Sequence, residues 1–125
     1  MQNIFLVGIG GALGAVLRYL LGTQVHEWFK PGDFPLGTLL VNLSGCFLIG
    51  LVYVWLSEHG LAGAHSLLLI TGVLGGYTTL SSFGLELFRL LSSGQMAYAA
   101  IYFVLTNAAG LLAVWAGHIV AGRML

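Results

Sequence analysis

The chain alternates between long apolar runs and short polar connections. Four runs have the length, about 20 mostly apolar residues, that a helix needs to cross the hydrocarbon core of a bilayer. They cover residues 4–21, 35–56, 66–91 and 97–121, and most polar residues of the first connection lie in residues 25–34. No connection is long enough for a water-soluble domain. The pattern predicts an all-α membrane protein whose whole length, residues 1–125, forms a single domain of four transmembrane helices.

Composition supports this class and argues against others. Of the 125 residues, 58% are hydrophobic and 6% are charged, whereas a soluble domain carries about 25% charged residues. The formal net charge is zero, so we expect no nucleic-acid partner. Cys46 is the only cysteine, which rules out a disulfide within the chain. The four histidines lack metal-ligand spacing and no nucleophile–base set can be assembled, so the sequence gives no support for an enzyme.

The third apolar run contains the most informative segment, residues 72–83. Three glycines are followed by four hydroxyl side chains within five positions, namely Thr78, Thr79, Ser81 and Ser82. Irregular backbone at membrane depth is tolerated only where it is buried in protein or lines an aqueous path, and broken helices direct their ends at ions. We therefore predict a broken third helix and a transport function. In the alternative interpretation, the hydroxyls bond back to their own helix.

Polar side chains in other spans are candidates for the same path. Asn42 lies inside the second span, four residues after Thr38 and on the same helical face. Tyr102 and Asn107 lie in the fourth span, and Glu86 is the only carboxyl group near a span interior. An amide at membrane depth requires partners. We favour contact between Asn42 and an ion, and the alternative is a hydrogen bond that joins two helices.

The glycine spacing predicts how the helices pack. Gly10 with Gly14, and Gly72 with Gly76, have the G-x-x-x-G spacing that lets membrane helices approach closely. Arg18 lies near the end of the first span. Its side chain either extends to the membrane surface or bonds the carbonyls of a neighbouring broken helix.

Charges near the ends of the spans encode the orientation poorly. The few basic residues differ only slightly in number between the two ends, so the positive-inside rule gives a small preference. We hypothesise that the chain inserts in both orientations and forms an antiparallel dimer. A dimer would also form an aqueous path more easily than one thin four-helix unit. The intramembrane polar groups are mostly neutral donors, which suit a conducted ion and weakly favour an anion.

These motifs together resemble the Fluc fluoride channels, also called CrcB-like proteins. The resemblance covers essentially the full chain and is carried by residues 10–19, 37–45 and 75–83, with Asn107 and Gly110 in the fourth span. It implies an antiparallel, dual-topology homodimer in a bacterial inner membrane. Each dimer would have two pores that give passive, selective export of fluoride.

The resemblance also implies roles for individual residues. The fluoride pore would be formed by Thr38, Asn42, Thr79, Leu80, Ser81, Ser82, Phe83, Glu86 and Tyr102. Backbone carbonyls of Gly75 and Thr78 from both subunits would bind a structural sodium ion at the centre of the dimer. Arg18 and Asn107 would have structural roles.

Leu80 departs from the family pattern, which has phenylalanine at this position. Phe83 would then be the one aromatic residue of the motif that presents its positive ring edge to fluoride. We expect conduction to survive at a changed rate. One alternative function is a small multidrug-type, dual-topology transporter, but it would need a carboxylate in the first span, where Arg18 is the only charge. Another is a non-conducting assembly subunit, which would leave the clustered hydroxyls unexplained.

Overall fold

The structure, a computed structural model, describes all 125 residues and contains only helices. In chain order they are α1 (Gln2–Phe29), α2 (Leu36–Glu58), α3 (Ala64–Ser66), η1 (Leu67–Leu74), α4 (Gly75–Tyr77), α5 (Leu80–Ser92), α6 (Met96–Val104), η2 (Leu105–Ala109) and α7 (Gly110–Met124). The segments η1 and η2 are π-helical, with wider turns than an α-helix. The backbone stays helical from α3 to α4, and again from α6 to α7.

Four helical stretches are long and apolar enough to cross a membrane, as predicted. They contain 28, 23, 29 and 29 residues. Only 23 of the 125 residues are buried within the chain, and most large apolar side chains are exposed. An apolar surface of this extent requires a nonpolar surrounding, so the chain is a multi-pass membrane protein.

The first connection is shorter than the sequence suggested. Residues 25–29 were expected to belong to a loop, but α1 continues to Phe29. This stretch contains no glycine or proline, so nothing in it stops the helix. The helix ends at Lys30, which has a left-handed backbone with φ of 44° and whose N–H donates to the His26 carbonyl at 3.0 Å. Pro31 follows and cannot continue the helix.

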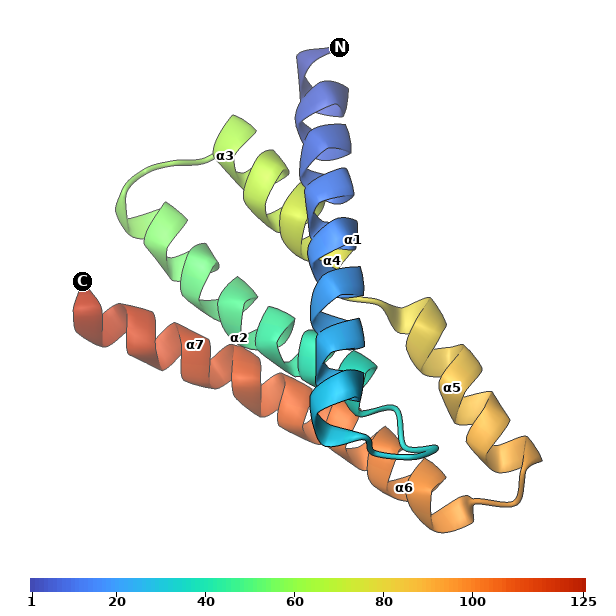
Figure 1. Ribbon diagram of the computed structural model, residues 1–125. Helices are drawn as coiled ribbons and strands as arrows, with labels where there is room; N and C mark the ends of the chain where they lie inside the picture. The colour runs from blue at the N-terminus through green and yellow to red at the C-terminus, as the bar shows by residue number, and fades with distance from the viewer.

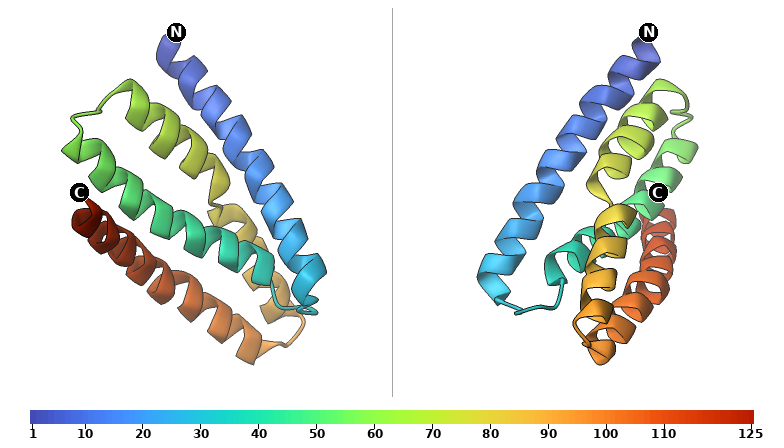
Figure 2. Two further views of the ribbon diagram at one scale, coloured as in Figure 1. Left: turned by 60° about the vertical axis from the view of Figure 1, so that its left-hand side comes forward. Right: turned by 90° about the vertical axis from the view of Figure 1, so that its right-hand side faces the viewer.

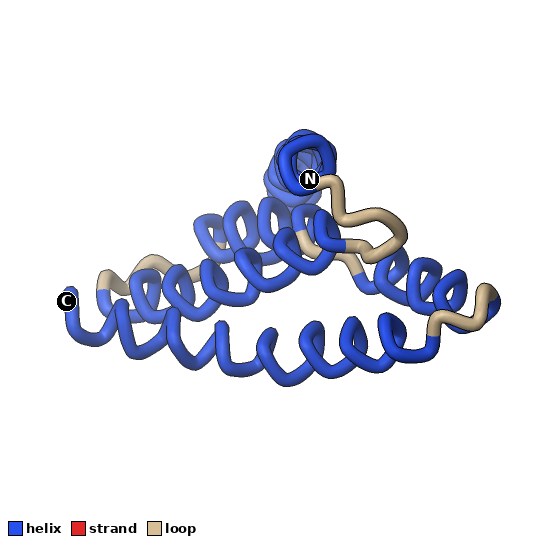
Figure 3. The backbone as a smooth tube through the Cα atoms, turned by 60° about the horizontal axis from the view of Figure 1, so that its bottom comes forward, coloured by secondary structure: helices blue, strands red, loops and turns tan.

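The helices form a thin, open array (Figures 1 and 3). In this array α2 and α7 run side by side, and α1 lies against η1 and α4 (Figure 2). The helix α5 leaves this group after α4 and packs against α6. The loops that join α1 to α2 and α5 to α6 lie at the same end of the molecule, where the Gln95 side chain donates to Asp33 at 3.2 Å.

Glycines at the predicted positions set the contact between α1 and the third span. A Cβ placed on Gly10 would lie 2.9 Å from the Gly72 Cα, and one on Gly14 would lie 2.0 Å from the Val73 carbonyl oxygen. A Cβ on Gly76 would lie 2.5 Å from the Gly11 carbonyl oxygen. The two G-x-x-x-G pairs therefore face each other, and the prediction of close helix packing is confirmed.

Candidate functional site

Two extended residues separate α4 from α5 in the middle of the third span. Thr78 has φ and ψ of −79° and 155°, and Thr79 has −148° and 117°. The Thr78 hydroxyl donates to the Leu74 carbonyl at 3.0 Å. For this one hydroxyl, the alternative of bonding back to its own helix is therefore correct.

Asn42 on α2 holds the extended backbone in place. Its Oδ1 accepts a hydrogen bond from the Thr79 N–H at 2.8 Å, and its Nδ2 donates to the Thr79 carbonyl at 3.1 Å. Asn42 and Thr79 are each 8% exposed. A buried backbone group without a partner is costly, so the amide compensates for the hydrogen bonds that the helix loses at Thr79. The link between helices, which was the alternative interpretation of Asn42, is present. One N–H of the amide is not used by this link.

Thr79 also begins the next helix. Its Oγ1 accepts from the Ser82 N–H at 3.1 Å, which is the hydrogen bond of an N-cap residue. The same oxygen lies 3.3 Å from Ser81 Oγ and 3.2 Å from Ser82 Oγ. Three of the predicted hydroxyls therefore gather at the amino end of α5, which carries the positive end of the helix dipole.

Both carbonyls that were predicted to bind sodium have lost their helical donors. In a continuous α-helix, the Thr79 N–H would donate to Gly75 and the Ser82 N–H would donate to Thr78. In the structure the Thr79 N–H instead donates to Asn42, and the Ser82 N–H donates to the Thr79 hydroxyl. Two carbonyl oxygens are thus left without these partners at the interruption.

A cavity of about 300 Å³ lies beside the interruption. Its lining comes from the second, third and fourth spans. The lining residues include Asn42, Cys46, Gly75, Thr78, Thr79, Leu80, Phe83, Thr106 and Asn107. Leu80 is 80% exposed, so the cavity opens onto the surface of the single chain. The hydroxyl oxygen of Thr106 is buried without a hydrogen-bond partner. The site therefore combines unused polar groups with an apolar wall.

Phe83 lines this cavity and packs against α6. It is 7% exposed, and its ring centroid lies 5.1 Å from that of Tyr102 at an interplanar angle of 49°. The Phe83 ring also lies 6.4 Å from the Phe103 ring. These contacts are within the range of aromatic pairs, so the ring is held in a fixed orientation.

Beyond Phe83, Glu86 accepts hydrogen bonds from two other helices. Thr38 on α2 donates to Oε1 at 2.7 Å, and Tyr102 on α6 donates to Oε2 at 2.7 Å. Tyr102 is 0% exposed. Each carboxyl oxygen of Glu86 therefore has one hydroxyl partner. The structure brings together these three side chains, which the family resemblance placed in one pore.

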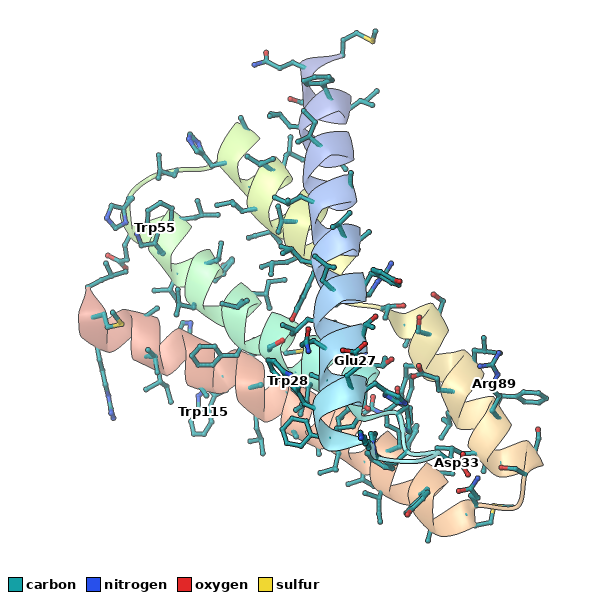
Figure 4. The ribbon with its side chains drawn as sticks, in the orientation of Figure 1. Glu27, Trp28, Asp33, Trp55, Arg89 and Trp115 are labelled. Carbon is teal, nitrogen blue, oxygen red and sulfur yellow. The ribbon has the colours of Figure 1, made fainter.

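Polar cavities extend from Glu86 to the end of the molecule. One, of about 400 Å³, is lined by His26, Gly32, Asp33, Pro35, Glu86, Arg89, Leu90, Ser93 and Gln95. A second, of about 360 Å³, shares His26, Pro35 and Glu86 and adds Gly22, Thr23, Gly37 and Thr38. Asp33 and Arg89 lie at this end of the bundle (Figure 4).

The remaining predicted residues are less closely involved. Ser81 is exposed and contacts the Thr79 hydroxyl. Asn107 is exposed and donates to the Phe103 carbonyl of its own helix at 2.8 Å, while it also lines the first cavity. Arg18 on α1 is half-buried, and no hydrogen bond links it to the carbonyls of the interrupted span.

Two contributions were not predicted from the sequence. Cys46 lines the first cavity, and its position four residues after Asn42 on one helical face was the available signal. Tyr77 and Ser44 share a hydrogen bond of 2.8 Å across α4 and α2. No local pattern indicated this bond, because it joins residues that are 33 positions apart.

Comparisons with known proteins agree on one family. The family model described as "CrcB-like protein, Camphor Resistance (CrcB)" matches residues 5–118. A protein of Rhizobium meliloti named "Fluoride-specific ion channel FluC" is 47% identical over 118 residues, which are 94% of each chain. Proteins with the same name from Acidobacterium capsulatum and Aquifex aeolicus are 44% and 42% identical over 120 residues. These alignments cover 95% of this chain, and 95% and 96% of the respective relatives.

Proposed function

We propose, since the chain belongs to the CrcB-like protein family, that it is a fluoride-selective ion channel giving passive fluoride export across the membrane. The observation that carries the proposal is the interruption of a membrane-spanning helix beside a cavity lined by Asn42, Thr79 and Phe83. Moving a bare ion into hydrocarbon is prohibitively costly, and neutral donors along a path lower this cost without trapping the ion.

The polar groups at the cavity suit an anion. The free N–H of Asn42 and the amino end of α5 offer positive partial charge there. Phe83 lines the same cavity, and its ring edge is the part of an aromatic side chain that attracts an anion. Thr38 and Tyr102 donate hydrogen bonds to Glu86, which follows this donor set in the chain order of α5. We assign these residues, together with Ser81, Ser82 and Leu80, to the pore.

We further propose that the functional unit is an antiparallel, dual-topology homodimer in a bacterial inner membrane, with one four-helix domain per subunit. Leu80 and the cavity opening beside it lie on the exposed surface of the single chain. A second copy would close this opening and give each pore a complete wall. Each tagged terminus should be detected on both sides of the membrane. Detection of a terminus on one side only would reject dual insertion.

A structural sodium ion fits the groups at the interruption. The Gly75 and Thr78 carbonyls lack their helical donors, and unwound carbonyls in membrane helices are known ligands of sodium. Two copies related by a two-fold axis would supply four such oxygens. If the site exists, the purified dimer should dissociate at lower temperature when sodium is replaced by a large organic cation. Equal stability in both salts would refute it.

The proposed activity is tested by reconstitution into liposomes loaded with fluoride. A fluoride electrode measures efflux after the addition of a potassium ionophore, and a chloride electrode measures the same for chloride-loaded vesicles. We expect fluoride efflux without chloride efflux. Absence of fluoride efflux from vesicles that contain intact protein would reject the proposal. Transport of an organic cation that requires a proton gradient would favour the multidrug-type transporter instead.

A further inference from the structure

Polar residues form a continuous stripe along α5, from the interruption to the end of the helix. Ser82, Glu86, Arg89 and Ser93 are spaced by four, three and four positions, so they share one face. Ser82 lies at the proposed pore. Glu86 accepts hydrogen bonds from Thr38 and Tyr102. Arg89 is the next member toward the membrane surface, and it has no assigned role in the proposed function.

Glu86, Arg89 and Ser93 line the same polar cavity of about 400 Å³. The cavity also receives His26 from α1 and Asp33 from the loop before α2. An anion that enters from this end must therefore pass two carboxylates, Asp33 and Glu86, before it reaches the neutral donors. Arg89 is the residue in this lining that carries a permanent positive charge.

Arg89 forms no direct ion pair with the neighbouring carboxylates. Both oxygens of Glu86 accept from hydroxyl groups, and an oxygen of Asp33 accepts from Gln95. Arg89 itself is exposed, and no ion pair engages its guanidinium group. A cation without an ion-pair partner at this mouth makes the local potential less negative, and so reduces the repulsion that the two carboxylates exert on an anion.

We propose that Arg89 eases the entry of fluoride at this mouth of the pore by offsetting part of the negative charge of Asp33 and Glu86. This inference rests on the proposed channel function. It treats Arg89 as an electrostatic determinant of the entry rate, acting before the ion meets the dehydrated part of the path. Its contribution should therefore depend on ionic strength, because salt shortens the Debye length from about 30 Å at 0.01 M to about 3 Å at 1 M.

The test compares fluoride efflux from liposomes that contain the wild-type protein, R89Q, R89E or R89K. Fluoride is kept below saturation, and ionic strength is set with a salt of a large impermeant organic anion. At about 0.01 M ionic strength, we expect R89Q to reduce efflux about threefold and R89E about tenfold, while R89K retains most of it. At about 1 M the differences should nearly vanish.

Lys30→Gln is the matched control, because it removes one positive charge at the same end of the molecule from a residue outside the cavity lining. K30Q should have a smaller effect than R89Q. Wild-type efflux in R89E at low ionic strength would overturn the inference, and so would a loss that is equal at both ionic strengths. Absence of fluoride efflux from the wild type would instead reject the channel function itself.

Discussion

Asn42 and Thr79 are joined through both polar atoms of the Asn42 side chain, which binds the N–H and the carbonyl of the Thr79 backbone. A side chain on α2 thus replaces the helical hydrogen bonds that the third span loses where it is interrupted. The same residue faces the cavity. In the proposed channel, Asn42 would therefore have two tasks, because it holds the Thr79 backbone and would present a donor to the ion.

Replacement of Asn42 by aspartate should abolish most conduction. The substituted carboxylate cannot donate to the Thr79 carbonyl, and it places negative charge where an anion must pass. A barrier increase of about 3 kcal/mol corresponds to a loss of roughly a hundredfold in fluoride efflux. Asn3→Asp is the control, since Asn3 is exposed in the first turn of α1. Unchanged efflux in N42D would remove Asn42 from the pore.

Loss of the Tyr102 hydroxyl should destabilise the protein as well as slow conduction. In Tyr102→Phe, the half-buried Glu86 Oε2 oxygen loses its donor, which costs about 1 kcal/mol. Thermal unfolding of purified protein in detergent measures the change. Tyr98→Phe serves for comparison, because Tyr98 lies on the same helix and is more exposed. Equal midpoints for both variants would contradict the importance of the Tyr102–Glu86 bond.

Addition of one methyl group at Gly14 should prevent correct packing of α1. The new Cβ would lie 2.0 Å from the Val73 carbonyl oxygen, and neither backbone can move away without separating the helices. Overpacking of this kind costs about 1–3 kcal/mol or more, so we expect a clear loss of folded Gly14→Ala protein in size-exclusion chromatography. Gly8→Ala places its Cβ in open space. A folded yield of G14A equal to that of G8A would show that the contact is not tight.

Substitution of Leu80 by phenylalanine should change the rate of fluoride efflux and leave selectivity over chloride intact. Leu80 is 80% exposed, so a larger ring meets no clash within the chain. A second aromatic edge beside the cavity adds a weak attraction for the anion. Efflux of both halides before and after the substitution measures the effect. An L80F variant that conducts chloride would contradict the assignment of selectivity to the neutral donors.

Much of the fold follows from the order of residues alone. The four apolar runs coincide with the four membrane helices, because length and hydropathy decide which segments can cross a bilayer. The G-x-x-x-G spacing correctly placed the contact between α1 and the third span. The end of α1 was missed, since apolar character falls after residue 21 but the helix ends only where Lys30 and Pro31 stop it.

The details of the candidate site were less accessible. The pairing of Asn42 with Thr79 joins residues 37 positions apart, and it depends on how two helices rotate against each other. The sequence indicates that the Asn42 amide requires partners but not which ones. The grouping of Thr38, Glu86 and Tyr102 came from the family resemblance, and the structure supplies the hydrogen bonds that join them. The π-helical segments had no signal in the sequence.

The π-helical turns of η2 change the angle between the side chains of α6 and those of α7 around the helix axis. A helix of constant pitch would link the direction of Tyr102 rigidly to that of Gly117, whose backbone approaches Phe47 on α2. A stretch with wider turns changes the angular register between the two halves. One half can therefore point its phenol at Glu86 while the other docks its glycine against a neighbour. A deletion of one residue within 105–109 would force these two alignments to compete.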